Sequence, residues 1–336
     1  MATIKEIARH CGVSSATVSK ALNGYPDIGD ETRERIQKAA RELEYFPNSV
    51  ARALKTNYTN NLGVLFIDKM RSGLGHEYFS SMLESFKVTA EESGYDITFI
   101  SRNLGGRKMS YLEHCRYRRC DGVVIASVDF EDPEIIELIN SNIPIVTVDH
   151  VFNNRSAILS DNVQGMQDLL THAHSLGHRK IAYIHGEDTL VTQKRLAGFH
   201  RAAQELGLKI PDEYILPSLY HDTKGSRLAT KKLLALPDPP TCILYPDDFS
   251  YIGGMNEIEH AGKSIPNDIS VAGYDGIYLS QALRPRLTTI KQDTAAIGRA
   301  AANQLIAAIQ EPKTSFPEQI MIPGQILPGD TIKALY

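Results

Sequence analysis

Polar side chains that could contact a ligand follow several short, β-rich runs. Six of them stand where such a run ends: Asp68, Asp149, His185, Asp247, Asp248 and Asp275. Carboxylates that converge on a cleft can accept hydrogen bonds from a neutral polyhydroxylated ligand, to which an arginine can donate. Paired carboxylates could instead be catalytic, as in glycoside hydrolysis. A third interpretation is that single residues, such as Asp247 or Asp248, cap the helices that follow the strands.

The β-rich runs alternate with amphipathic segments. The expected strands are 62–68, 95–101, 121–127, 143–149, 180–186, 241–247 and 269–275. The expected helices lie near 77–93, 108–117, 132–141, 163–176, 190–206, 224–235 and 248–261. This alternation predicts an α/β fold, in which parallel sheets flanked by helices form two similar lobes. Ligands of such sheets bind beyond the carboxyl ends of the strands, where the six polar residues stand.

The start of the chain shows a different pattern, two short helical stretches joined by a tight turn at Gly12. Thr3 and Glu6 have the spacing of a capping box, and Ser14 is placed to cap the second helix. An inward stripe on that helix leaves four residues facing outward: Ser15, Ala16, Ser19 and Lys20. Small side chains let a helix approach base edges, and lysine reaches guanine or phosphate. A helix-turn-helix that reads DNA is predicted, and the alternative is an ordinary helical hairpin.

A third amphipathic segment and a short connection follow. Residues 29–44 place basic side chains opposite an apolar face, from which they could contact phosphates. Residues 48–55 form a helical segment too short to be stable alone. Within it, Leu54 beside Ala51 has the composition of a wedge that enters the minor groove. The alternative is a linker with one buried leucine.

The sequence motifs together resemble one known family. TIKEIA, GVSSATVSKALNG, TRERI and YFPNSVARALK resemble the DNA-binding and hinge region of the lactose/galactose-repressor family of bacterial transcription regulators. LGHRKIAYI, QKRLAGFHRA, ISVAGYDG and RPRLTTIKQD resemble the effector-binding core of the same repressors, whose fold is like that of periplasmic sugar-binding proteins. The resemblance covers nearly the whole chain. It implies that Ser15, Ala16 and Lys20 read bases and that Leu54 intercalates.

The resemblance also assigns roles in an effector site. It implies that Arg195 binds ligand hydroxyls, that Asp149 and Asp275 accept from them, and that Tyr220 stacks on an apolar face. Asp247 departs from the family pattern, because a neutral residue usually precedes the aspartate matched by Asp248. An extra carboxylate favours a ligand with more donors or a positive group. The loop at 69–79 also lacks the common Asn-Pro-Phe-Phe signature, although some of its side chains are still expected to face the cleft.

These interpretations give definite residue assignments. The expected DNA contacts are Thr3, Ser14, Ser15, Ala16, Thr17, Ser19, Lys20, Asn23, Ala51 and Leu54. The expected effector contacts are Asp68, His76, Tyr78, Phe79, Asp149, Arg195, Tyr220, Asp247, Asp248 and Asp275. The expected domains are a helix-turn-helix domain at 1–46, a hinge at 47–60 and an effector-binding and dimerisation core at 61–336. Within the core we expect lobe 1 at about 61–160 and 292–322, and lobe 2 at about 161–291 and 323–336.

Composition limits the other possibilities. The 336 residues carry a net charge of −4, although residues 1–60 hold nine Lys and Arg against seven Asp and Glu. The four cysteines lack zinc-site spacing, so reduced thiols and no metal site are expected. No phosphate-binding glycine loop, export signal or membrane-spanning run is seen, which favours a cytoplasmic protein without a cofactor. The short, proline-broken C-terminal segment favours a homodimer over a tetramer.

The function predicted from these observations is a transcriptional repressor that binds a palindromic DNA operator as a dimer. A small polar effector, a sugar or sugar derivative, would switch it, and no catalytic residue is assigned. One alternative is a solute-binding protein without a DNA role, which the amino-terminal module opposes. The other is a carbohydrate-processing enzyme, which only the carboxylates encourage.

Overall fold

The computed structural model describes residues 2–46, 58–67 and 73–335. The chain divides into two compact units, Met1–Thr59 and Asn60–Tyr336, which we call unit 1 and unit 2. Three of the expected contact residues, Ala51, Leu54 and Asp68, lie outside the described residues. Most of the expected hinge lies outside them as well.

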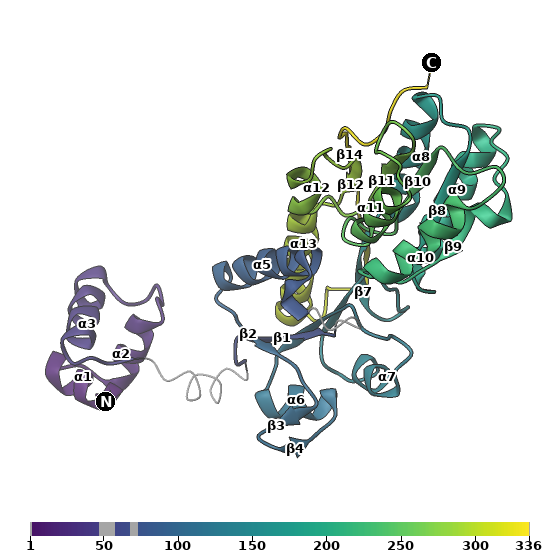
Figure 1. Cartoon of the computed structure of the whole chain (residues 1–336). Helices are drawn as coiled ribbons and strands as arrows, with labels where there is room; N and C mark the ends of the chain where they lie inside the picture. The colour runs from purple at the N-terminus through teal and green to yellow at the C-terminus, as the bar shows by residue number, and fades with distance from the viewer. Residues whose placement is uncertain (1, 47–57, 68–72, 336) are drawn as a thin grey trace. The chain divides into compact units, whose positions relative to one another are not determined.

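The described residues of unit 1 form three helices, α1 (Ile4–Cys11), α2 (Ser15–Leu22) and α3 (Asp30–Glu42), drawn in purple in Figure 1. The predicted capping box is present, since Thr3 and Glu6 exchange hydrogen bonds at the start of α1. Gly12 ends that helix at φ 63°, a left-handed conformation that glycine adopts without strain. The three helices bury one small apolar cluster: Ile7, Ala8, Val18, Ala21, Ile36, Ala39 and Ala40.

The first part of unit 2, which we call lobe 1, is built on a parallel sheet with the order β13-β7-β6-β5-β1-β2. Its strands are β1 (Asn61–Phe66), β2 (Asp96–Phe99), β5 (Gly122–Ala126), β6 (Ile145–Val148), β7 (Ser156–Ser160) and β13 (Gln319–Ile322). In Figure 1, α5 (Glu77–Glu92) and α13 (Thr294–Gln310) cover one face, and α6 (Tyr111–Arg118) and α7 (Pro133–Ile139) cover the other. Alternate strand residues serve the two faces, as Val64 and Leu65 on β1 show.

The close packing of α13 on α5 depends on a glycine. A Cβ atom at Gly298 would lie 2.3 Å from the carbonyl oxygen of Met82, which belongs to the backbone of α5 and cannot simply rotate away. We expect Gly298→Ala to lower the free energy of unfolding by about 1–3 kcal/mol, as overpacked cores do. Denaturant unfolding of the full chain measures this loss. Gly75→Ala, at a site with open space around it, is the matched control, and an equal loss there would contradict the explanation.

The second part of unit 2, lobe 2, has a parallel sheet with the order β11-β10-β8-β9. Its strands are β8 (Ile181–His185), β9 (Ile215–Pro217), β10 (Cys242–Leu244) and β11 (Ser270–Ala272). Helices α8 (Asn162–Ser175) and α9 (Leu190–Glu205) pack on one face, and α10 (Thr223–Leu234) and α11 (Tyr251–His260) pack on the other. The short helix α12 (Tyr278–Ala282) and the antiparallel pair β12 (Thr289–Lys291) and β14 (Gln325–Leu327) complete the lobe.

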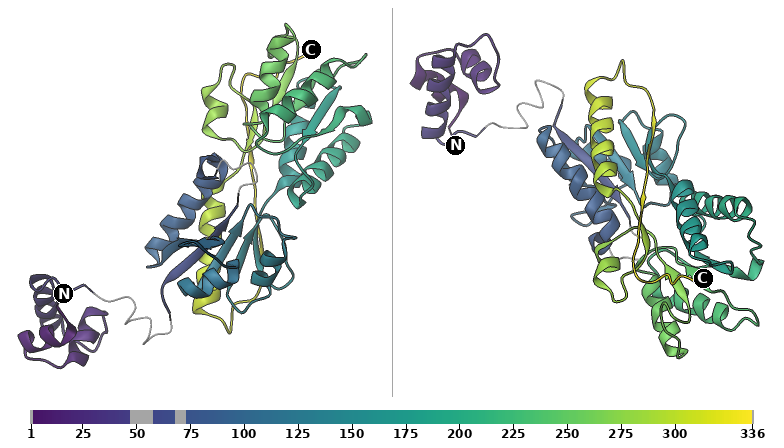
Figure 2. Two further views of the ribbon diagram at one scale, coloured as in Figure 1. Left: turned by 60° about the horizontal axis from the view of Figure 1, so that its bottom comes forward. Right: turned by 90° about the horizontal axis from the view of Figure 1, so that it is seen from above.

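The chain passes between the lobes at three places. It enters lobe 2 after β7, returns to lobe 1 between β12 and α13, and leaves it again between β13 and β14. Figure 2 shows the last part of the chain, in yellow, running from one lobe to the other. The small elements are the hairpin β3 (Asn103–Leu104) and β4 (Arg107–Lys108), and the 3-10 turns η1 (Gly73–Gly75) and η2 (Asp212–Tyr214). No helix in the described part of the chain is both long and apolar enough to cross a bilayer.

All seven β-rich runs of the sequence form strands, each shorter than expected. The sequence interpretation did not include the strands β7, β9, β12, β13 and β14, the hairpin β3–β4, or the helices α12 and α13. Most of the missed strands have three to five residues and are held by their neighbours in the sheet rather than by a strong pattern of their own.

Candidate functional site

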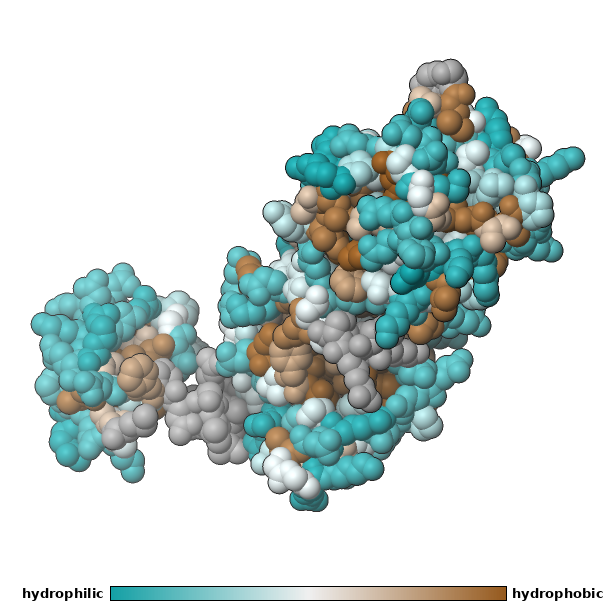
Figure 3. All heavy atoms as spheres, viewed as in Figure 1, coloured by the Kyte–Doolittle hydropathy of each residue, from teal (hydrophilic) through white to brown (hydrophobic). Residues whose placement is uncertain are grey.

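The outer face of α2 is small and polar. Ser15, Ala16 and Lys20 are exposed, whereas Val18 and Ala21 are fully buried against α1 and α3. Ser14 caps the helix, because its Oγ accepts from the backbone N of Thr17 at 3.1 Å. On the visible side of unit 1 in Figure 3, hydrophilic residues predominate. The small side chains on the exposed face of α2 therefore allow another molecular surface to approach the helix closely.

The other residues expected at this surface stabilise local structure. Thr3 caps α1, and Asn23 donates from Nδ2 to the carbonyl oxygen of Ser19 at 2.6 Å. The hydroxyl groups of Thr17 and Ser14 form a hydrogen bond at 2.9 Å. Lys20 forms an exposed ion pair with Asp27, and surface pairs of this kind contribute little to stability.

Unit 2 contains a cavity of about 170 Å³ to which both lobes contribute side chains. Lobe 1 provides residues that follow β5 and β6 together with the beginning of α5, and lobe 2 provides residues that follow β8, β10 and β11 together with α9. In Figure 3, hydrophobic residues are visible where the two lobes meet on this face of the core. The cavity thus lies beyond the carboxyl ends of both parallel sheets, as the fold class predicts.

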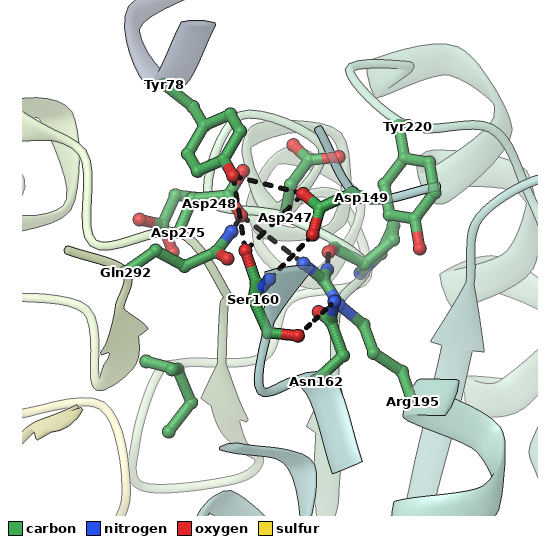
Figure 4. Close-up of polar contacts among 12 residues, drawn as sticks. Tyr78, Asp149, Ser160, Asn162, Arg195, Tyr220, Asp247, Asp248, Asp275 and Gln292 are labelled. Carbon is green, nitrogen blue, oxygen red and sulfur yellow. Dashed lines mark hydrogen bonds and ion pairs between the residues drawn. The ribbon is translucent and has the colours of Figure 1, made fainter. Parts of the chain in front are cut away.

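Arg195 on α9 is the central cation of the cavity and is only 3% exposed. Its Nε donates to Oδ1 of Asn162 and its Nη1 donates to the carbonyl oxygen of Pro246, both at 2.7 Å. Its guanidinium carbon lies 3.5 Å from the ring centroid of Tyr274. Its Nη2 lies 3.6 Å from Oδ1 of Asp275. These contacts fix the guanidinium plane, which Figure 4 shows among the carboxylates.

Asp149 follows β6 and joins three elements of lobe 1. Its Oδ1 accepts from the backbone N of Ser160 at 2.7 Å, and its Oδ2 accepts from the hydroxyl of Tyr78 at 3.2 Å. Burial raises the pKa of the Asp149 carboxyl, although these donors and Arg195 oppose the rise. The carboxylate is therefore held in place before any ligand arrives.

Asp275 follows β11 and is the acidic residue nearest to Arg195. Its Oδ1 accepts from Nε2 of Gln292 at 2.7 Å. Burial raises the pKa of Asp275 to about 7, even though Arg195 lowers it. Its backbone has φ 103°, in the left-handed region, so the fold maintains a strained conformation at this position.

Asp247 lines the cavity but already accepts three hydrogen bonds. Its Oδ1 accepts from the backbone N of Ser250, and its Oδ2 accepts from Oγ of Ser250 and from the backbone N of His221, each at 2.7 Å. Its contacts to Ser250 stabilise the turn before α11, whose N-cap residue is Ser250 rather than Asp247. Together with Asp149, Glu187 and Asp275 it gives the described lining of the cavity four carboxyl groups against one guanidinium.

Aromatic rings from both lobes line the cavity and give it flat surfaces. The ring of Tyr220 lies 5.4 Å from the guanidinium of Arg195, and a Cβ atom at Gly186 would come within 2.4 Å of that ring. In lobe 1, Phe130 and His150 stack with centroids 4.1 Å apart. Such surfaces suit the apolar faces of a ring-shaped ligand, while the acidic groups suit its hydroxyls.

Comparisons with known proteins match this arrangement. Residues 3–48 match the model for bacterial regulatory proteins of the lacI family, and residues 170–332 match that for a periplasmic binding protein-like domain. The probable HTH-type transcriptional repressor ExuR of Bacillus subtilis (strain 168) is 32% identical, over 100% of this chain and 99% of that protein. The chain belongs to the lacI family of bacterial regulatory proteins.

Other lacI-family proteins are similar over almost the full length. The ribose operon repressor of Haemophilus influenzae is 30% identical over 97% of this chain and 98% of that protein. The solved lac repressor dimer bound to operator and the anti-inducer ONPF has a TM-score of 0.79 at 24% identity, over 99% of each chain, and thus shares the fold. As a member of the lacI family, the chain is a DNA-binding transcriptional repressor rather than an enzyme or a plain solute-binding protein.

The structure of this lacI-family chain brings most of the expected effector residues together. Eight of the ten line the cavity: His76, Tyr78, Phe79, Asp149, Arg195, Tyr220, Asp247 and Asp275. Asp248 corrects the expectation, because it is fully buried and is not among the lining residues. Its Oδ1 accepts from Oγ1 of Thr289 at 2.6 Å and its Oδ2 accepts from the backbone N of Ile277 at 2.9 Å. It therefore connects the start of α11 to β12 and to the start of α12.

Sequence analysis also missed lining residues. They are Ser127, Val128, Phe130, Val148, His150, Glu187, Thr189, Leu190, Val191, His221 and Gln292. Several stand directly after an expected strand, including the acidic Glu187, and could have been found by extending each strand end by a few residues. Gln292 gave no such signal, because it follows β12, a strand that the sequence did not indicate. Within residues 2–46, 58–67 and 73–335, no cluster of three or more His, Cys, Asp or Glu side chains is arranged to hold a metal ion.

Proposed function

We propose that residues 1–46 bind one half of a palindromic operator, with α2 in the major groove, and that residues 47–60 form a hinge between the two units. Two copies in a symmetric dimer would supply the two recognition helices. The exposed Ser15, Ala16 and Lys20 support base contact, and the caps Thr3 and Ser14 place helix N-termini for phosphate contact. Ala51 and Leu54 are assigned to the hinge contacts on sequence grounds alone.

We further propose that residues 61–336 bind the effector between the two lobes, with the lobe boundaries expected from the sequence. The effector would be a neutral polyhydroxylated molecule, a sugar or sugar derivative, and no cofactor is assigned. The observation that carries this proposal is the convergence of Arg195, Asp149 and Asp275 on one cavity. An anionic ligand would meet more carboxylates than cations there, whereas hydroxyls can donate to the carboxylates and accept from Arg195.

The proposed switch follows from the origin of the lining residues. Asp149 and Tyr78 belong to lobe 1, whereas Arg195 and Asp275 belong to lobe 2. A ligand that contacts all four stabilises the conformation in which the lobes are close. If that conformation differs from the open one in DNA affinity, then DNA and effector change each other's affinity by the same factor.

A thermal-shift panel tests the effector class. Neutral sugars, sugar acids, nucleosides and polyamines are added separately to the full chain, since a ligand of the native state raises its melting temperature by mass action. We expect a neutral sugar to give the largest shift and to change operator affinity in a gel-shift assay. The proposed effector class is wrong if a sugar acid, a nucleoside or a polyamine gives the largest shift instead.

The affinity for the effector is expected to rise with pH. Hydroxyl donors favour the ionised form of Asp275, so binding lowers its pKa from about 7 and releases a proton. Affinity should therefore increase by up to about tenfold per unit below the free pKa and level off above it. Titration calorimetry across neutral pH measures this, and Asp275→Asn should flatten the profile. The same linkage affects stability: because the pKa of Asp275 is raised in the folded protein, the free energy of unfolding decreases as the pH rises from about 4 to about 7.

A further inference from the structure

The C-terminal turn of α6 carries two cysteines that neither the effector cavity nor α2 uses. Cys115 lies in the last two turns of the helix and is fully buried. Cys120 follows the helix by two residues and is half-buried. In Figure 1, this helix lies on the side of the lobe 1 sheet opposite to α5 and α13.

The backbone of this turn brings the two cysteines together. Arg119 has φ 50°, in the left-handed region. The backbone N of Cys120 donates to the carbonyl oxygen of Cys115 at 3.0 Å, and that of Arg119 donates to the carbonyl oxygen of Arg116 at 3.1 Å. These two bonds define a Schellman motif, which folds the second residue past the helix end back over the residue five positions earlier. An apolar contact usually fills that space, and here two thiols fill it.

The two thiols differ in their surroundings. The neighbouring thiol of Cys120, together with burial, raises the pKa of Cys115. Cys115 packs in the apolar cluster between the sheet and α7, whereas Cys120 accepts from Nδ2 of Asn61 at 3.7 Å and is partly open to solvent. A soluble oxidant therefore reaches Cys120 first, and the turn places Cys115 beside the oxidised sulfur.

We propose that Cys115 and Cys120 form a reversible disulfide when the protein meets a peroxide. In the first step an S–O bond forms at Cys120 while the peroxide O–O bond breaks, which gives a sulfenic acid and one water or alcohol. In the second step the sulfur of Cys115 attacks, the S–S bond forms, the S–O bond breaks, and the Cys115 proton leaves with hydroxide as water. Two thiols are oxidised and one peroxide is reduced. In a reducing cell such a disulfide would be transient.

The position of this pair gives the disulfide a structural consequence. Asp121, the next residue, accepts from the backbone N of Asn60 through Oδ2 at 2.7 Å, and its own backbone N donates to the carbonyl oxygen of Asn61 at 2.8 Å. Asn60 and Asn61 are the first residues of unit 2. A bond to Cys115 draws Cys120 Sγ away from Asn61, at the point where the chain enters the core from unit 1.

The test is a mass measurement on the full-length chain. The protein is treated with hydrogen peroxide, alkylated and cleaved after glutamate, which releases residues 114–131 as one peptide whose only cysteines are this pair. We expect this peptide to lose two hydrogen atoms, to resist alkylation, and to regain both hydrogens with dithiothreitol. The proposal is overturned if the wild-type peptide stays fully alkylatable or goes directly to a sulfinic acid at Cys120.

Two variants assign the order of the steps. Cys115→Ser should accumulate a sulfenic acid at position 120 that dimedone traps, whereas Cys120→Ser should leave Cys115 unmodified because it is buried. Equal trapping at Cys115 and Cys120 in the two variants would contradict the assigned order. If a variant does not fold, the mass of the wild-type peptide before and after peroxide still decides whether the bond forms.

Discussion

Replacing Arg195 by alanine is expected to abolish the response of the repressor to its effector. Among the described residues, Arg195 is the one arginine or lysine that lines the cavity, and the substitution leaves Asp149 and Asp275 without its guanidinium. Truncating one partner of a buried, hydrogen-bonded charged contact costs about 2–5 kcal/mol of binding free energy, which corresponds to a loss of effector affinity of at least about 30-fold. Titration calorimetry measures that affinity, and a gel-shift assay with and without effector measures the response.

Operator affinity without effector should stay close to that of the wild-type chain, because Arg195 makes its described contacts within unit 2. Arg195→Lys is the matched control, since it keeps the charge but cannot keep both the bond to Asn162 and the bond to Pro246. It should retain folding and recover only part of the response. If the operator affinity of the Arg195→Ala protein still changes at the effector concentrations that act on the wild-type protein, the ligand binds elsewhere.

Local signals in the sequence were sufficient for the elements of unit 1. The capping pairs of α1 and α2 and the left-handed turn at Gly12 depend on neighbouring residues, so the sequence alone specifies them. The apolar face of α3 follows the helical period and packs as expected. By contrast, β7 and β13 pair with each other although about 160 positions separate them. No local pattern encodes such a pairing, and it is stabilised only once the other strands are in place.

The candidate cavity was predictable in kind but not in its details. The strand ends predicted that Asp149 and Asp275 would face a ligand site, because ligands of parallel sheets bind beyond the carboxyl ends of the strands. The sequence could not distinguish Asp247, which faces the cavity, from its neighbour Asp248, which faces away. Both residues lie in the turn between β10 and α11, and the conformation of that turn, which the sequence pattern does not specify, decides which of them meets the ligand.

Backbone strain is concentrated at this cavity. Four of its lining residues other than glycine have φ values between 54° and 103°: Ser127, Asp149, His221 and Asp275. Each such residue costs folding free energy, and it persists only where surrounding contacts hold it. The bonds from Ser160 to Asp149 and from Gln292 to Asp275 are contacts of this kind. The fold thus holds these carboxylates in position at some cost in folding free energy. This preorganisation reduces the conformational entropy that is lost when the ligand binds.

On the DNA side, Ala16→Glu is expected to reduce specific operator binding by about 100- to 1000-fold, close to the non-specific level. Ala16 is exposed near the start of α2, where a methyl group allows close approach to base edges. A glutamate there is larger and places a negative charge against the phosphates and base acceptors of the duplex. Helix stability should change little, because a carboxylate is favourable in the first turn of a helix. Fluorescence anisotropy with an operator duplex and a scrambled duplex measures both affinities.

The matched control is Ala295→Glu, the same substitution at an exposed position in the first turn of α13, in unit 2. It changes the net charge of the protein equally, so it corrects for the general repulsion between the chain and DNA. If both variants lose the same affinity for operator, charge alone accounts for the effect and α2 is not the reading element. If only Ala16→Glu loses it while the scrambled duplex is bound about as before, the exposed face of α2 distinguishes operator from other DNA.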